Sequence, residues 1–528
     1  MELVLGVAGL LAVVVAVSAA ARRLGLLAPI LLVVVGIVLA LLVPALRELR
    51  LDAEFVLIGI LPPLLYVAAL EISVPAVRYN LRPILMLAIG LVIASTLAVG
   101  FVTNALRPDI PLAICLALGA IVAPPDAIAA TAVARRIGLP RRLVTILEGE
   151  SLFNDATALV LFKVAIAAAV GTAIGPAAIG VEVLLAAGGG IVVGGVSAVL
   201  AGWLHRRATD PLTDNAISLL TPFVVAVLAD SVDASPIVAV VVTGLYLGHR
   251  LPTLMSAGSR LQMGAFWRLV KFLLEGLVFL LVGLQLPDVV LDLRTPIGEV
   301  VQLTVAVVGT AIVVRFLWII PGTYLQRLIP SVRRSDPAPP LAVPILVSWA
   351  GMRGVITVAT ALALPMTLAG GQPYPRELFV WLAFAVIIVT LVGQGTTLGW
   401  MSRVLKAPRD DPQADLRAEA EIQREASAAA RAALDEAAGD APDDVVQRLR
   451  RVNARRLDAA HDRVAGGTDT HSHAYVTLRR RMIEAEREVF RRARDEGRIA
   501  EEVLWRAQHG LDLEEALLER SAADEDED

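Results

Sequence analysis

Three observations predict an all-α polytopic membrane protein with a helical tail. Of the 528 residues, 56% are hydrophobic and 19% are charged, which is too apolar for a soluble globular protein of ordinary composition. Apolar segments long enough to cross a bilayer recur as far as about residue 405. Charged residues concentrate beyond that point. We therefore predict a transmembrane domain over residues 1–405 and a helical tail over residues 406–528.

About thirteen segments reach the roughly 17 to 25 apolar residues that a membrane-spanning helix needs. The first has neither a basic lead-in nor a small-residue cleavage site, so we interpret it as a retained helix and not as a signal peptide. The predicted spans are 3–21, 25–44, 54–72, 82–105, 110–134, 143–170, 177–204, 214–231, 235–250, 265–286, 297–328, 341–368 and 377–403.

The arginines of alternate loops predict the orientation of these spans. Cytoplasmic loops carry the excess of basic residues, and an odd number of spans then places the N-terminus outside and the tail in the cytoplasm. One set of loops holds sixteen arginines: Arg22, Arg23, Arg78, Arg82, Arg135, Arg136, Arg141, Arg142, Arg206, Arg207, Arg250, Arg260, Arg268, Arg327, Arg333 and Arg334. The other set holds five: Arg47, Arg50, Arg107, Arg294 and Arg376.

Two spans are interrupted in their middle. Residues 121–127 include consecutive prolines, which exclude a regular helix there. Residues 348–354 place glycines around a mid-membrane arginine, Arg353. Broken backbone at this depth is tolerated only where it is buried in protein or lines a cavity. Paired breaks in the two halves of a chain indicate a transporter with inverted repeats and a binding site near the midplane.

The tail differs completely from the spans. A linker at 408–412 precedes Ala-, Glu- and Arg-rich segments that we predict to be helices, at about 414–438, 443–465, 473–496 and 499–521. Neither the nearly neutral net charge of -4 nor any motif suggests a nucleic-acid partner. A single cysteine, Cys115, excludes a disulfide framework and a thiolate metal site. The sequence contains no Gly-Lys-Ser/Thr phosphate loop, so we expect no ATP hydrolysis and no cofactor.

The candidate site is the polar stretch 148–155, near the start of an apolar span. Ionisable groups within a membrane are costly and are functional candidates by default. On a helix, Glu150 and Asn154 are one turn apart, as are Ser151 and Asp155. Four side chains with oxygen atoms therefore share one stripe, which predicts a small site for a cation or a proton.

We predict Asp155 to be the group that binds the transported ions alternately. A carboxylate in a partly dehydrated cavity holds a proton more tightly than one in water, so Na⁺ and H⁺ can compete for it. Ser151 and carbonyl groups of the 123–125 break can complete an oxygen shell for a hard cation. Asn154 can donate a hydrogen bond to a carboxylate or to a carbonyl of the break. Asp126 could serve as an ion ligand or could stabilise the ends of half-helices.

Arg353 is always charged and needs a partner at this depth. We expect Glu150 to be that partner, because such a pair would leave Asp155 able to change its charge. Glu275 and Arg315 are further charges within spans and are candidates to pair with each other.

Three motifs in this order resemble one known family. Residues 149–155, with 123–127 upstream and 349–354 downstream, are similar to the NhaP-type sodium/proton antiporters of the cation:proton antiporter-1 family. The resemblance covers about residues 1–405. It implies a homodimer in which a dimerisation domain holds a mobile core domain with two crossed broken helices, and elevator-like alternating access.

The resemblance also implies roles for individual residues. An Asn-Asp pair is associated in this family with electroneutral one-for-one exchange. Many members have threonine where this chain has Pro125, so that contribution to the ion shell is absent here. The implied ligands of Na⁺ and H⁺ are Asp155, Ser151 and Asp126, with Glu150, Asn154 and Arg353 organising the site.

The leading hypothesis is a secondary antiporter of the cell membrane that exchanges Na⁺ for H⁺ and serves pH and sodium homeostasis. Exchange of K⁺ or Li⁺ and a cation channel are alternatives, which transport assays with each cation would separate. A remote alternative is an intramembrane aspartyl protease using Asp126 and Asp155, although the local sequences typical of such proteases are missing around both.

Overall fold

The computed structural model of the chain describes residues 2–526 except 44–45, 47–54, 127–129, 132–133, 135–137, 172–175, 369–370, 409–410, 439–440, 465–469, 497 and 500. The chain divides into two compact units, Met1–Arg409 and Asp410–Asp528. The predicted linker spans this division. Parts of several predictions fall outside the described residues. They are Ala127 of the first break, residues 409–410 of the linker, parts of the predicted spans 25–44, 54–72 and 110–134 and of the tail segments 443–465 and 499–521, and four loop arginines, Arg47, Arg50, Arg135 and Arg136.

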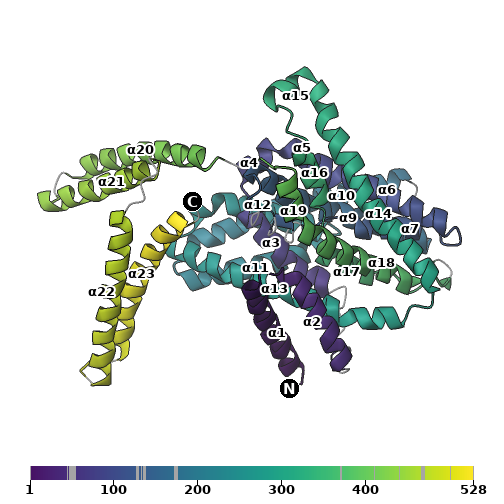
Figure 1. Cartoon of the computed structure of the whole chain (residues 1–528), viewed down its shortest axis with the longest axis horizontal. Coiled ribbons are helices and arrows are strands. Elements are labelled where there is room, and N and C mark those ends of the chain that lie inside the picture. The colour runs from purple at the N-terminus through teal and green to yellow at the C-terminus, as the bar shows by residue number, and fades with distance from the viewer. Residues whose placement is uncertain are drawn as a thin grey trace. The chain divides into compact units, whose positions relative to one another are not determined.

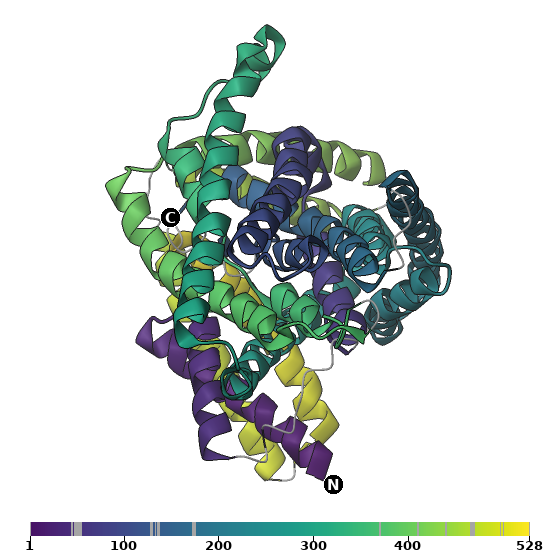
Figure 2. The same ribbon diagram turned by 90° about the vertical axis from the view of Figure 1, so that its right-hand side faces the viewer.

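The described part of the first unit contains helices and no strand, and they pack side by side in a bundle (Figures 1 and 2). Each predicted span overlaps one helix or a run of helices, and two short helices lie between predicted spans. In order they are α1 (Glu2–Leu24), α2 (Ala28–Leu42), η2 (Phe55–Ile60), α3 (Leu61–Glu71), α4 (Val74–Tyr79), α5 (Leu81–Leu85), η3 (Met86–Leu91), α6 (Val92–Leu106), α7 (Leu112–Val122), α9 (Arg141–Val170), α10 (Pro176–Arg207), α11 (Pro211–Asp230), α12 (Pro236–Leu254), α13 (Ala257–Leu291), α14 (Ile297–Leu325), η4 (Gln326–Leu328), α15 (Pro330–Ser335), α16 (Ala342–Trp349), α17 (Val355–Leu362), α18 (Arg376–Val389), η6 (Thr390–Gln394) and α19 (Gly395–Val404).

Within the described residues, nine of these helices or helix runs are long and apolar enough to cross a membrane. Shorter apolar helices occupy Ala28–Leu42, Ile58–Glu71 and Leu112–Val122. The helix pattern confirms an all-helical, multi-pass membrane protein, while the number of thirteen spans stays a prediction.

The long helix α10 shows how these segments divide their faces between protein and lipid. Leu184, Val192 and Val196 are 72%, 64% and 66% exposed, which is costly in water and favourable in a lipid bilayer. On the face towards α12, a Cβ atom added at Gly194 would lie 2.5 Å from the Ala239 carbonyl oxygen. Glycine here lets the two backbones approach closely, as small residues do between membrane helices.

The two interrupted spans meet at their breaks. The helix α7 ends at Val122, and the other span separates into α16 and α17 between Trp349 and Val355. The Asp126 N–H donates to the Met352 carbonyl at 2.7 Å, which joins the two breaks directly. A Cβ atom at Gly354 would collide with the Asp126 carboxylate, so this contact requires glycine.

The second unit consists of two helix pairs (Figure 1). The helices α20 (Pro412–Ala437) and α21 (Asp443–Val464) pack together, as do α22 (Thr470–Asp495) and α23 (Glu501–Asp526). Ile483, Leu511 and Leu518 form a small buried cluster between α22 and α23. Arg479 also forms an ion pair with Glu514 at 2.6 Å. The tail is therefore helical at the places that the sequence predicts.

Candidate ion-binding site

The polar stretch 148–155 lies on α9, where its side chains are shielded from solvent. Glu150, Asn154 and Asp155 are buried, with exposed fractions of 1%, 0% and 3%. A Cβ atom at Gly149 would lie 2.5 Å from Cδ1 of Ile84, so glycine permits the close packing of α9 against α5. Three polar side chains of one helix are thus buried inside the bundle beside this close helix contact.

Three of the predicted site residues line one cavity of about 310 Å³. Asp155 and Ser151 contribute from α9, and Asp126 contributes from the break after α7. The lining also includes Glu275 of α13 and Thr357 of α17. The cavity therefore brings carboxylate and hydroxyl oxygens together, which are the ligand types that hard cations prefer.

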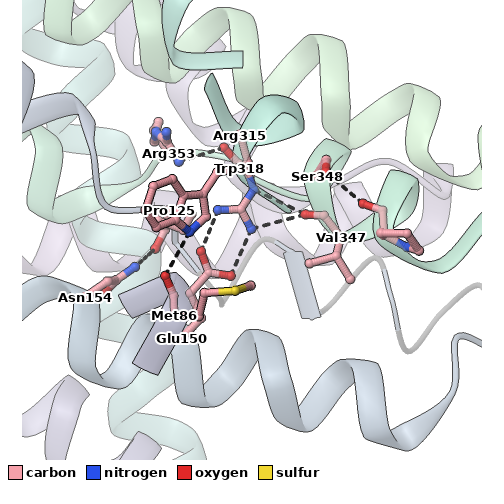
Figure 3. Close-up of polar contacts among 11 residues, drawn as sticks. Met86, Pro125, Glu150, Asn154, Arg315, Trp318, Val347, Ser348 and Arg353 are labelled. Carbon is pink, nitrogen blue, oxygen red and sulfur yellow. Dashed lines mark hydrogen bonds and ion pairs between the residues drawn. The ribbon is translucent and has the colours of Figure 1, made fainter. Parts of the chain in front are cut away.

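Asn154 faces the broken backbone (Figure 3). Its side-chain amide donates to the Pro125 carbonyl at 3.0 Å, one of the two kinds of acceptor that the sequence suggested. The next residue, Asp126, donates its backbone N–H to the Met352 carbonyl of the second break. Pro125 and Asp126 therefore connect α9 to both breaks. Asn154 thus fixes the backbone beside Asp126.

The predicted pair of Glu150 with Arg353 is wrong, since Glu150 is paired with Arg315 of α14 (Figure 3). The two guanidinium nitrogens of Arg315 donate to the two carboxylate oxygens at 2.5 and 2.9 Å. Arg315 also donates to the Val347 carbonyl from Nε at 3.2 Å and from Nη2 at 3.1 Å. Both side chains are at most 2% exposed, so this is a buried pair with fork geometry.

In the described part of the chain, Arg353 is held by backbone and hydroxyl groups, and no carboxylate forms an ion pair with it. The Arg353 guanidinium donates to the Gly351 carbonyl at 3.1 Å, and the Arg353 backbone N–H donates to Oγ1 of Thr390 at 3.0 Å. A Cβ atom at Gly351 would lie 2.5 Å from Cδ of Arg315. The glycine therefore lets the Arg315 side chain pass the second break and reach Glu150, which is the physical reason that Arg315 takes the predicted place of Arg353.

Sequence reasoning missed part of the cavity wall. Glu275, considered as a partner of Arg315, instead lines the cavity with Lys271 one turn earlier on α13. The Lys271 ammonium lies 3.0 Å from Glu71 at the end of α3. The sequence signal for this wall is that Lys271 and Glu275 are charged residues one turn apart within an apolar helix. In the described part of the chain no group of three or more His, Cys, Asp or Glu side chains is arranged to hold a resident metal ion.

Comparisons with known proteins identify the family. The model of the family described as "Sodium/hydrogen exchanger, transmembrane" matches residues 9–404. The chain is 36% identical over 527 residues to an uncharacterised Na⁺/H⁺ exchanger of Mycobacterium tuberculosis, covering 97% of this chain and 95% of the relative. It is 34% identical over 380 residues to a sodium, potassium, lithium and rubidium/H⁺ antiporter of Bacillus subtilis, covering 69% of this chain and 56% of the relative.

Among solved structures, the sodium proton antiporter MjNhaP1 of Methanocaldococcus jannaschii at pH 8 matches with a TM-score of 0.60 and 18% identity. The match covers 77% of this chain and 99% of the antiporter, and it shows that the fold is shared. The family model and the relatives describe exchangers and not peptidases, which confirms the resemblance inferred from the three motifs. The chain belongs to the sodium/hydrogen exchanger family of membrane transport proteins.

Proposed function

We propose that the protein is a secondary antiporter that exchanges a monovalent cation, foremost Na⁺, for H⁺ across the cell membrane. The observation that carries the proposal is the single cavity lined by Asp155, Ser151 and Asp126, with broken backbone in its wall. The family membership and the names of the relatives support the same activity.

In this proposal, Asp155 holds either a proton or a cation but not both. The carboxylate is buried at 3% exposure, and a cation bound there exchanges its water for the Ser151 hydroxyl, the Asp126 carboxylate and neighbouring backbone carbonyls. Glu150 is neutralised by Arg315, and Asn154 carries no charge. Of the two buried carboxylates of the α9 stretch, Asp155 is thus the one that changes its charge, which supports electroneutral one-for-one exchange.

We further propose a homodimer working by elevator-like alternating access, with the N-terminus outside and the tail in the cytoplasm, serving pH and sodium homeostasis. The arginine bias of the loops supports this orientation. The contact between the two breaks supports a core domain that moves as one body.

Everted membrane vesicles that express the protein test the activity. Added Na⁺ should collapse an imposed pH gradient, and Asp155→Asn should abolish the response while the purified variant melts at or above the wild-type temperature, because a buried charge has been removed. Asp230→Asn is the matched control, since Asp230 is an exposed carboxylate at the end of α11, and it should transport normally. Retained transport in Asp155→Asn would contradict the proposed role.

Exchange of K⁺ is a second candidate. The Bacillus subtilis relative is named for sodium, potassium, lithium and rubidium, and Pro125 removes a side-chain ligand from the shell. Proteoliposome assays with each cation over a range of pH would rank the ions. A K⁺ response equal to the Na⁺ response would make the protein a broad cation antiporter.

A further inference from the structure

A second cavity of about 420 Å³ lies apart from the ion-binding cavity and shares none of its lining residues. It is enclosed by α5 and η3, the first turns of α9, the end of α14 with η4, and α16. Its floor is apolar and includes Ile146, Ile319 and Val343. Its charged groups are three arginines, Arg82, Arg142 and Arg327, and one carboxylate, Asp336.

The charges in this cavity do not balance. Asp336 accepts from Arg327 at 2.5 Å and lies 2.9 Å from Arg142, so two guanidinium groups share its single negative charge. Within the described residues, no hydrogen bond or ion pair involves the side chain of Arg82, which is exposed. The cavity therefore carries a net positive charge above an apolar floor.

We propose that this cavity binds a phosphate group, carried by an anionic phospholipid whose chain lies on the apolar floor. Guanidinium groups are well suited to phosphate oxygens. The three arginines belong to the loops that the arginine bias assigns to the cytoplasm, where membranes display anionic headgroups. A free phosphate would use the arginines but would leave the apolar floor uncovered.

A lipid bound in this cavity would lie next to residues that support the Glu150 and Arg315 pair beside the ion-binding cavity. Val347 lines the cavity, and its carbonyl accepts two hydrogen bonds from Arg315. Ile146, also in the lining, precedes Glu150 by one turn of α9. Met86 of the lining accepts from the Trp318 indole at 3.1 Å (Figure 3). A bound lipid would pack against residues that hold the Glu150 and Arg315 pair and would stabilise them.

The test is thermal unfolding of the purified full-length protein in a neutral detergent, titrated with a short-chain phosphatidylglycerol below its micelle concentration. We expect the melting temperature to rise by about 2 to 4 °C at saturation, with no rise for the matching phosphatidylcholine or for inorganic phosphate. Arg82→Gln should weaken the apparent affinity about tenfold, because one charged contact is lost. Val343→Trp, which fills the cavity, should abolish the effect.

The control is Arg333→Gln. Arg333 is an exposed arginine of α15, close in sequence to Arg327, and does not line the cavity. It should bind phosphatidylglycerol like the wild type. Equal weakening by Arg333→Gln would show attraction to basic loops in general and would overturn the cavity site. Equal stabilisation by inorganic phosphate would overturn the lipid assignment, and no stabilisation by either would overturn both.

Discussion

The buried pair of Glu150 and Arg315 makes a quantitative prediction that separates it from the expected pair with Arg353. Glu150→Gln keeps the shape of the side chain and one acceptor but removes the charge, which leaves Arg315 buried at 2% exposure with only the Val347 carbonyl as a full partner. Two charge-assisted hydrogen bonds of about 1.5 to 3 kcal/mol each are weakened or lost. Breaking a buried pair typically costs about 3 to 5 kcal/mol.

A double-mutant cycle measured by equilibrium unfolding in mixed micelles isolates the pair. The variants Glu150→Gln and Arg315→Gln, alone and together, should give a coupling energy of at least about 2 kcal/mol. The matched cycle of Glu150→Gln with Arg353→Gln should give less than about 1 kcal/mol, because Arg353 donates to the Gly351 carbonyl instead. A larger coupling with Arg353 than with Arg315 would refute the assignment of the pair.

Two further predictions concern the breaks and the tail. Gly354→Ala should lower the melting temperature and the apparent Na⁺ affinity, because the added Cβ atom would collide with the Asp126 carboxylate. The control is Gly298→Ala, which has open space around it and should be neutral or slightly stabilising. Equal effects of the two substitutions would exclude the collision. In the tail, hydrogen bonds from Arg479 hold the pKa of Glu514 below its usual value of 4.5. The stability from this pair is present above that value and is lost as the pH falls through the lowered pKa. Hydrogen exchange of α22 and α23, corrected for its intrinsic pH dependence, should therefore speed up in the wild type as the pH falls below 4.5. Arg479→Gln should remove that change, and an unchanged acid response in this variant would contradict the link.

Much of the fold could be predicted because membrane helices are encoded locally. Length and apolarity define each span, and consecutive prolines or clustered glycines exclude regular helix wherever they occur. The family resemblance implied that the two broken helices cross, and the hydrogen bond from Asp126 to Met352 joins the two breaks. For the same reason, the composition of the tail predicted its four helices.

The partner of Glu150 could not be predicted because it depends on the packing of distant helices. Arg315 is 165 residues away in the sequence, and only the rotation and depth of α14 against α9 decide whether its side chain reaches the carboxylate. The sequence favours Arg353 as the partner of Glu150, because Arg353 lies at a break. The wall that α13 contributes to the cavity was missed for the same reason, because a charge in an apolar helix does not reveal which neighbour it faces.

The hydrogen bonds at the first break have a consequence for speed and selectivity. Asn154 holds the Pro125 carbonyl, and Met352 holds the Asp126 N–H, so these two peptide groups are already fixed in place before any ion arrives. A cation that sheds its water here would meet dipoles whose orientation was fixed during folding, and little rearrangement would remain to be made at binding. In the proposed antiporter, a shell fixed in this way would discriminate by ion size, and it would also permit rapid release, because the site would not need to reorganise when the ion leaves.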